Sequence, residues 1–345
     1  MRESTFQIFK NTFTKATALA AVAASKKIQK FYEAPLSYSA DFKAWGRLLD
    51  GEAVNAMQEV FKTQSNFYIE VRGSEGRKDT RRDGIESPDL YGSYGPRSGT
   101  IVEIVNDAVE GTSFASRNMP GSTSILAAVL GQKNGLRSTG KFDYMSKLFG
   151  PPQLKGKISL EFSPAENIKS ALRVFNLQNP QDLAVIILNR PRNSYEIESA
   201  QNLGVTTILI PGGDLMPAVL AVQDPQILKQ IKKSRIQENI KAVLVMGSGG
   251  WEEGIIAAAA AKAVGGHAEG RVWSEDKELI EQSKIMTVDD LVPAEARSIL
   301  VSASPITDDI WFNISGANDA NVQTIAITHR GIEISHEEVQ QKSFV

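Results

Sequence analysis

Cysteine is absent from this sequence and histidine is rare. The 345 residues contain no cysteine and three histidines. Disulfide frameworks, thiolate nucleophiles and cysteine-ligated zinc are therefore excluded, and a histidine-rich metal site is disfavoured. Any bound metal would have to be a hard cation held by oxygen atoms, such as Mg²⁺ or Mn²⁺.

A strong net charge and long hydrophobic runs are missing as well. The formal net charge is −2, so no basic field indicates a nucleic-acid partner. No segment approaches the ~20 apolar residues that cross a membrane as a helix. The hydrophobic fraction of 42% and the charged fraction of 23% are typical of a soluble globular protein. We therefore expect a cytoplasmic protein without membrane or nucleic-acid partners, or one of the plastid stroma if the source is eukaryotic.

The first thirty residues allow two interpretations. They are rich in Ser, Thr, Ala and Lys, as transit peptides are. However, Phe6, Phe9, Phe13 and Ala16 fall on one helical face. We favour a first helix over residues 5–30.

The hydrophobic pattern of the sequence changes near residue 179. Before this point, alternating patterns indicate half-buried strands, at 67–73, 100–105 and 124–131. After it, short apolar runs between helix-like segments indicate a parallel sheet covered on both faces, at 183–188, 205–210, 242–247 and 299–304. We predict an α+β metal-binding subdomain over 1–178, completed by 305–345, and an α/β substrate-binding subdomain over 179–304. Residues 73–99, rich in charge, Gly and Pro, predict a long surface loop.

The stretch IVEIVNDAVEGT, residues 101–112, ends an apolar run in carboxylates. If the strand ends at Asp107, a turn can bring Glu110 beside it, and Gly111 allows the backbone to approach a phosphate. Two adjacent carboxylates repel each other unless a divalent cation lies between them. The Thr112 hydroxyl could then orient a water. The same pattern also fits an acid-lined turn capped by a threonine.

Two further segments bring charge to predicted strand ends. GSGG (247–250) leads into a helix whose first turn carries Glu252 and Glu253, which either suit the helix dipole or supply a third carboxylate to the metals. Arg190 and Arg192 flank a proline after another strand, and they suit a second phosphate or are solvated surface residues.

Taken together, these segments resemble the class II fructose-1,6-bisphosphatases, including the dual fructose-1,6-/sedoheptulose-1,7-bisphosphatases. The resemblance covers nearly the whole chain, through LLDGEAVNAM (48–57), NDAVEGT (106–112), FDYMSKL (142–148), RPRNSYEIESAQNLGV (190–205), IPGGDLMPAV (210–219) and GSGGWEEGIIAAAA (247–260). It implies the fold of the lithium-sensitive sugar and inositol phosphatases, an α/β fold with an α+β portion, layered α-β-α-β-α in two packed subdomains.

The resemblance also implies an activity: metal-dependent hydrolysis of the 1-phosphate of fructose 1,6-bisphosphate or sedoheptulose 1,7-bisphosphate, with Mg²⁺ or Mn²⁺. The implied metal ligands are Asp50, Glu75, Asp107, Glu110 and Glu253. The implied catalytic residues are Glu75, Asp107, Glu110 and Thr112. The implied substrate contacts are Gly111, Thr112, Tyr144, Arg190, Arg192 and Asp214. We further expect a homo-oligomer, either a dimer or a tetramer.

One strand departs from the family pattern. Where the family carries two glutamates in IGEGE, this chain reads Arg72-Gly73-Ser74-Glu75-Gly76. In ungapped register Ser74 replaces the water-activating glutamate, and Arg72 lies near the cations unless the pleat points it away. Glu75 can serve if the strand end shifts by one residue. We predict this shift, because the other carboxylates would otherwise repel one another.

The substrate side departs from the pattern too. Asn193 stands in place of the histidine of the family's PRH motif, and only Asp214 of its DGD motif remains. Two alternatives therefore stay open: an inactive paralogue with a binding or assembly role, and a phosphatase of different specificity on the same fold.

Overall fold

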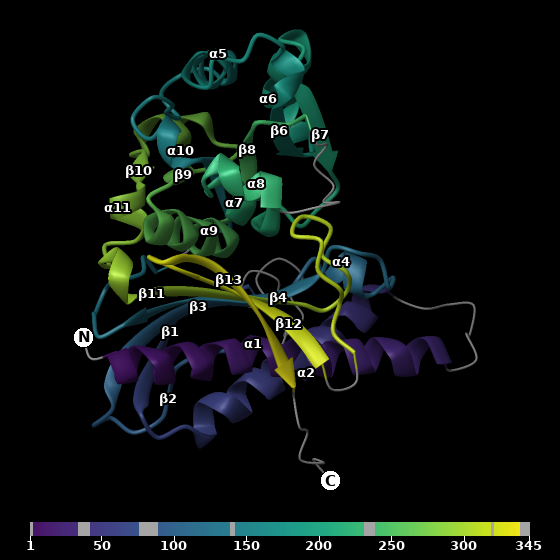
Figure 1. The fold of residues 1–345 in the computed structure, drawn as a ribbon, viewed down its shortest axis with the longest axis vertical. Helices are drawn as coiled ribbons and strands as arrows, with labels where there is room; N and C mark the ends of the chain where they lie inside the picture. The colour runs from purple at the N-terminus through teal and green to yellow at the C-terminus, as the bar shows by residue number, and fades with distance from the viewer. Residues whose placement is uncertain are drawn as a thin grey trace.

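The computed structural model describes residues 3–33, 42–75, 89–138, 142–230, 239–318 and 321–338. Its elements stack as helices, sheet, helices, sheet and helices (Figure 1). This is the layered fold that the family resemblance implies. Most of the predicted loop 73–99, namely 76–88, lies outside the described residues.

The first sheet has seven strands in the order β13-β12-β11-β4-β3-β1-β2. Its strands are β1 (Phe67–Ser74), β2 (Ser93–Tyr94), β3 (Thr100–Glu110), β4 (Thr123–Leu130), β11 (Ile299–Pro305), β12 (Asn321–Thr328) and β13 (Gly331–Glu338). The pair β1 and β3 is parallel, and the other neighbouring pairs are antiparallel.

The second sheet has six strands in the order β10-β9-β5-β8-β6-β7. Its strands are β5 (Tyr144–Gly150), β6 (Leu183–Leu188), β7 (Thr206–Ile210), β8 (Ala242–Gly250), β9 (His267–Val272) and β10 (Met286–Thr287). As predicted, β6, β7 and β8 run parallel. The sheet is mixed, however, because β5, β9 and β10 join it as antiparallel strands.

The prediction that residues 299–304 belong to the parallel sheet is wrong. They form β11, which pairs antiparallel with β4 and β12 in the first sheet. Every residue of β11 is buried, because this strand lies between two neighbours and under helices on both faces. A fully apolar run looks alike in either kind of sheet. The subdomain boundaries at 178 and 304 stay a prediction. Strand β5, which precedes residue 178, belongs to the second sheet, and β11, which begins before residue 304, belongs to the first.

The helices form the layers outside and between the sheets. They are α1 (Glu3–Glu33), α2 (Phe42–Thr63), α4 (Thr112–Ala115), α5 (Pro164–Val174), α6 (Ser194–Asn202), α7 (Leu215–Ala221), α8 (Pro225–Gln230), α9 (Trp251–Val264), α10 (Lys277–Gln282) and α11 (Val288–Leu291). Helices α1 and α2 cover the outer face of the first sheet, and α5 and α6 cover that of the second. As expected for the first helix, Phe6, Phe9, Phe13 and Ala16 are buried.

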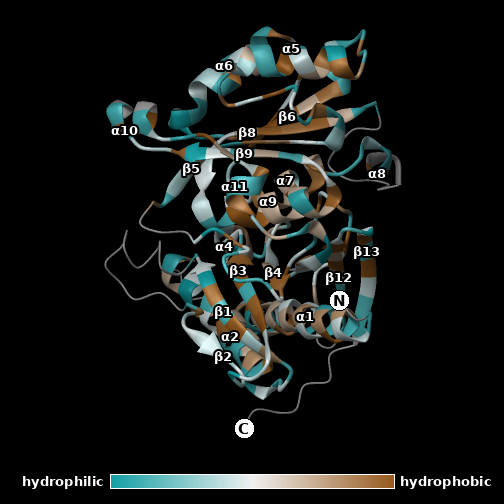
Figure 2. Ribbon diagram, turned by 90° about the vertical axis from the view of Figure 1, so that its left-hand side faces the viewer, coloured by the Kyte–Doolittle hydropathy of each residue, from teal (hydrophilic) through white to brown (hydrophobic). Residues whose placement is uncertain are grey.

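Helix α9 lies between the two sheets (Figure 1). All of its residues except Lys262 and Val264 are buried. Its alanines allow both sheets to approach closely, and a helix that is apolar all round belongs inside a core. Figure 2 shows hydrophobic residues along β3, β4, β6 and β8, as expected for strands with both faces covered. Among the described residues, no helix is both long and apolar enough to span a membrane.

Candidate functional site

Three carboxylates meet beside the carboxyl ends of β1 and β3. Ligand oxygens of Glu75, Asp107 and Glu110 all lie within 4.8 Å of one another. Asp107 and Glu110 are only 3% and 5% exposed. All three are metal ligands implied by the family resemblance, and the structure brings them together.

A β-bulge places Glu75 in this group. Along the parallel ladder Val71 pairs with Ile104, but the next pair is Gly73 with Val105. Arg72 is therefore an extra residue on β1. Since Ser74 pairs with Asn106, Glu75 comes level with Asp107. This is the one-residue shift that the Glu75 assignment requires, while the role of Glu75 stays a prediction.

The Arg72 side chain points away from the carboxylate cluster. Its Nη2 donates to Asn134 Oδ1 at 3.3 Å, and its Nε lies 3.8 Å from Glu103 Oε1. The Glu103 carboxylate is 1% exposed and accepts three backbone N–H bonds from the turn at residues 134–136. The guanidinium is thus paired with a different carboxylate from those of the candidate site.

The end of β3 is irregular, and this irregularity presents Asp107 and Glu110 on one side. The β3–β4 register shifts between these two residues. The backbone N–H of Val109 donates to Asp107 Oδ1 at 3.0 Å. Gly111 follows with φ +75°, and a Cβ there would lie 2.9 Å from Gly121 O, so this position requires glycine.

Thr112 links the carboxylate cluster to helix α2. Its Oγ1 donates to Val109 O at 2.8 Å and lies 3.3 Å from Asp50 Oδ1. The Thr112 hydroxyl therefore bridges Asp50, from the middle of α2, to the turn after β3. Asp50 is not part of the group of three carboxylates that lie closest together. Its predicted place as a metal ligand stays a prediction.

Helix α9 brings Glu253 to the same site. This residue lies in the first turn of α9 and is 7% exposed. The carboxylate folds back over the preceding loop and lies against Gly250, where a Cβ would come within 1.8 Å of Glu253 Oε2. Gly250, the last glycine of GSGG, thus leaves room for the carboxylate next to the backbone.

Burial and the neighbouring carboxylates disfavour the charged forms of Asp107 and Glu110. Burial, followed by the charges of Glu253 and Glu75, raises the pKa of Glu110 from 4.5 to about 8. Burial and the charges of Glu75 and Glu110 raise the pKa of Asp107 well above its usual range. Among the described residues, Asp107 Oδ2 accepts no hydrogen bond. A largely buried all-oxygen set with an unused lone pair fits a hard divalent cation.

Arg192 marks the substrate side predicted from the sequence. Its guanidinium carbon lies 4.8 Å from the Tyr144 ring centroid and 5.5 Å from that of Trp273. Its Nε donates to Ser248 O at 3.2 Å. Two aromatic rings and one carbonyl therefore hold the guanidinium in place. Trp273, which directly follows β9, is missed by the sequence analysis, and no motif there points to it.

Arg190 is held differently from Arg192. It is exposed, and its Nη2 donates to Pro211 O at 2.6 Å. Its charge nevertheless lies close enough to lower the pKa of Arg192, after burial of Arg192 itself. The two predicted phosphate-binding arginines therefore belong to one region, with Arg192 the more constrained.

A buried ion pair joins the two sides of the site. Lys147 Nζ lies 2.7 Å from Asp214 Oδ2, and these side chains are 2% and 8% exposed. Asp214 precedes α7, and the next backbone N–H, of Leu215, donates to Glu110 Oε1 at 3.3 Å. Lys147 is absent from the sequence-based set. The available signal was its position two residues after Met145, in phase with buried residues of β5.

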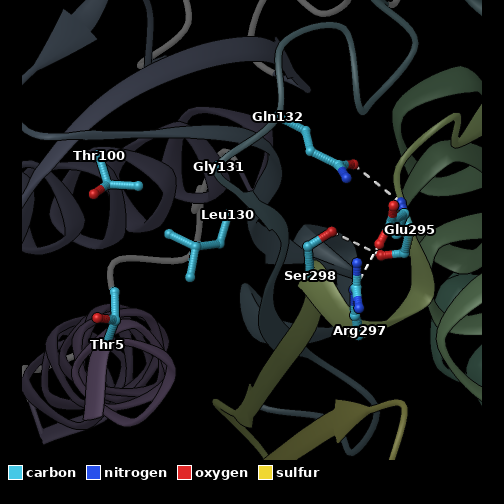
Figure 3. Close-up of a pocket in the computed structure, with 8 residues that line it drawn as sticks. All are labelled: Thr5, Thr100, Leu130, Gly131, Gln132, Glu295, Arg297 and Ser298. Atoms are coloured by element: carbon cyan, nitrogen blue, oxygen red, sulfur yellow. Dashed lines mark hydrogen bonds and ion pairs between the residues drawn. The ribbon is translucent and has the colours of Figure 1, made fainter. Parts of the chain in front are cut away.

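A surface cavity of about 270 Å³ lies away from these residues (Figure 3). Its lining includes Thr100 at the start of β3, Leu130 at the end of β4, and Ser298 just before β11. Asp107 and Glu110 lie at the opposite end of β3. The cavity is thus separate from the acidic cluster.

Comparisons with known proteins agree with the motifs. The family model described as bacterial fructose-1,6-bisphosphatase, glpX-encoded, matches residues 43–334. Three similar proteins are described as D-fructose 1,6-bisphosphatase class 2/sedoheptulose 1,7-bisphosphatase. The one from Prochlorococcus marinus is 30% identical over 65% of this chain and 60% of its own length. The Synechococcus protein is 27% identical over 76% of this chain and 78% of its own length. The Synechocystis protein is 32% identical over 50% of this chain and 44% of its own length. The chain thus matches less than two thirds of the Prochlorococcus and Synechocystis relatives.

Proposed function

Because the chain belongs to the family of bacterial, glpX-type fructose-1,6-bisphosphatases, we propose that it hydrolyses the 1-phosphate of a sugar bisphosphate. The substrates proposed are fructose 1,6-bisphosphate and sedoheptulose 1,7-bisphosphate, the two in the relatives' descriptions. The observation that carries this proposal is the carboxylate cluster in which partly buried Glu75 meets buried Asp107 and Glu110 beside Glu253.

These carboxylates would hold Mg²⁺ or Mn²⁺, with Asp50 contributing through or beside Thr112. A bound divalent cation would supply Lewis acidity to the transferred phosphoryl group and to the attacking water. The protein's own contribution is to hold acceptor oxygens in a buried site from which bulk water is largely excluded. Gly111 and Thr112, next to Glu110, are proposed to contact the reacting phosphate.

The sugar and its distal phosphate are proposed to lie along Tyr144, Arg192 and Asp214. With its Nε used by Ser248, Arg192 would offer its terminal nitrogens to phosphate, and the flanking rings limit the entropy lost on binding. Arg190 would add positive charge at the edge of the site. Asp214 is held by Lys147 and is proposed to orient sugar hydroxyls.

The direct test is phosphate release from both bisphosphates, with Mg²⁺ and with Mn²⁺. The native chain should be active, and Glu110→Gln should lower kcat by about 100-fold or more, as for loss of a key electrostatic group. Glu269→Gln is a matched control, because Glu269 is a half-buried carboxylate bound to Ser159 and Leu160, outside the cluster. Control activity should equal that of the native chain.

The outcomes separate the proposed function from its alternatives. A folded native chain that is inactive with either metal would favour a binding or assembly paralogue. Turnover of other phosphate esters but neither bisphosphate would indicate a different specificity. We also propose a homo-oligomer, a dimer or tetramer, in the cytoplasm or the plastid stroma, and light scattering tests the oligomer.

A further inference from the structure

We infer that Arg72 is a positioning residue for the metal site: its contacts with Glu103 and Asn134 keep Glu75, and not Ser74, level with Asp107. The inference rests on the proposed function in one respect, that Glu75 is a metal ligand. It concerns a residue outside the carboxylate cluster.

Two registers compete at the end of β1. In the observed one Arg72 is bulged, and Gly73 pairs with Val105. In a regular ladder without the bulge, Ser74 would be level with Asp107. A shift of one residue turns each side chain to the opposite face of a sheet. The choice of register therefore decides whether a carboxylate or a hydroxyl joins Asp107 and Glu110.

The groups that hold Arg72 are themselves fixed. Glu103 accepts backbone N–H bonds from Asn134, Gly135 and Leu136 at 2.6, 2.8 and 3.1 Å. A buried carboxylate with three such donors has a defined position. The turn is further defined by the left-handed backbone of Asn134, whose φ is 56°. This turn therefore offers a fixed acceptor surface to a guanidinium on the neighbouring strand.

Arg72 meets this surface at three points. Its Nη2 donates to Asn134 Oδ1 at 3.3 Å, and its Nε lies 3.8 Å from Glu103 Oε1. Its carbonyl oxygen accepts a hydrogen bond from Ser138 Oγ at 3.3 Å. A bulged residue leaves a ladder position unpaired, so it persists only if other contacts compensate. These three contacts are made in the bulged register. Arg72 therefore stabilises the bulged register relative to the regular one.

The first experiment measures Mn²⁺ affinity by calorimetry without substrate. Arg72→Ala removes the side-chain contacts but keeps the extra residue. The end of β1 should then exchange between the bulged and the regular register. The apparent affinity should fall about tenfold if one molecule in ten keeps the competent register. Arg72→Lys, which retains a charge but not the planar fork, should fall between Arg72→Ala and the native chain.

Deletion of Arg72 separates positioning from a general structural role. Without the extra residue, a regular ladder still pairs Gly73 with Val105 and leaves Glu75 level with Asp107. The deletion variant should therefore bind Mn²⁺ better than Arg72→Ala. A merely structural role for Arg72 would make deletion at least as harmful as alanine. The inference would be overturned if Arg72→Ala bound Mn²⁺ with native affinity, or if the deletion variant bound Mn²⁺ more weakly than Arg72→Ala.

The second experiment reports the register without any metal. Because the chain has no cysteine, introduced pairs form the only possible disulfides. In the native background, Glu75→Cys/Asp107→Cys should oxidise readily, and Ser74→Cys/Asp107→Cys should not. Adding Arg72→Ala should increase cross-linking of the second pair. If cross-linking follows this pattern but no chain binds Mn²⁺, the register inference stands and the proposed metal function fails. An unchanged pattern with Arg72→Ala refutes the inference.

Discussion

Neutralising Glu110 should stabilise the protein when no metal is bound. In Glu110→Gln the side chain keeps its shape and can still accept the Leu215 N–H bond through its amide oxygen. Its new NH₂ group can donate to Asp107 Oδ2, which accepts no hydrogen bond among the described residues. The substitution thus removes a buried charge and adds a donor where one is missing.

The size of the effect follows from the pKa of Glu110. A rise from 4.5 to about 8 in the folded state corresponds to roughly 5 kcal/mol at about 1.4 kcal/mol per unit. Since the folded pKa is the higher one, the stability contributed by the protonated form is complete below pH 4.5. It is lost as pH rises through about 8. With an unfolding entropy of about 0.7 kcal/mol/K for 345 residues, the gain in Tm should be at most about 7 °C.

Calorimetry with a chelator at pH 5 and pH 8.5 tests this reasoning. The Tm of Glu110→Gln should exceed that of the native chain at pH 8.5 and nearly equal it at pH 5. Added Mn²⁺ should raise the Tm of the native chain more than that of the variant. Glu103→Gln is the matched control, because this buried carboxylate already has three backbone donors and should lose stability on substitution. A native Tm equal to or above that of Glu110→Gln at pH 8.5 would refute the argument.

Substitutions at four further positions test the substrate side, the buried ion pair and the Thr112 hydroxyl. Arg192→Ala should raise KM more than it lowers kcat in steady-state assays, since a distal phosphate is bound about equally in the ground state and the transition state; an unchanged KM would show that Arg192 does not bind that phosphate. Lys147→Met should lower the free energy of unfolding by about 3–5 kcal/mol because it leaves Asp214 buried without its cation, and Lys147→Met/Asp214→Leu should recover most of that loss in urea titrations. Thr112→Val, which removes the hydroxyl and its bonds to Val109 O and Asp50 Oδ1, should lower the Tm slightly and lower kcat in protein that is still folded at the assay temperature; full activity would exclude a chemical role for this group.

The sequence predicts much of this fold because its strands carry local signals. Apolar runs place β6 and β8, and the spacing of Phe6, Phe9 and Phe13 places the first helix. Sheet membership is not local. Whether a buried run such as β11 joins one sheet or the other depends on contacts with β4, far away along the chain.

The candidate site divides in the same way. Asp107, Glu110 and Glu253 follow from motifs at strand and helix ends. The place of Glu75 depends on a single-residue bulge, which is stabilised by a turn about sixty residues further on. No motif identifies Lys147, because its role depends on the ion pair with Asp214, which lies in a distant segment of the chain. Such long-range pairings are invisible to periodicity.

The buried helix α9 has a mechanical consequence. It packs against both sheets and has almost no solvent-facing side, so the two halves share one continuous core. Large rigid-body rotation between halves needs an interface that can slide or part, and a common helix offers neither. The spacing between Glu253 at its first turn and Asp107 on β3 is therefore set at folding. Under the proposed function, substrate would therefore enter without rotation of one half against the other, and a fragment cut before α9 would be left with two uncovered sheet faces.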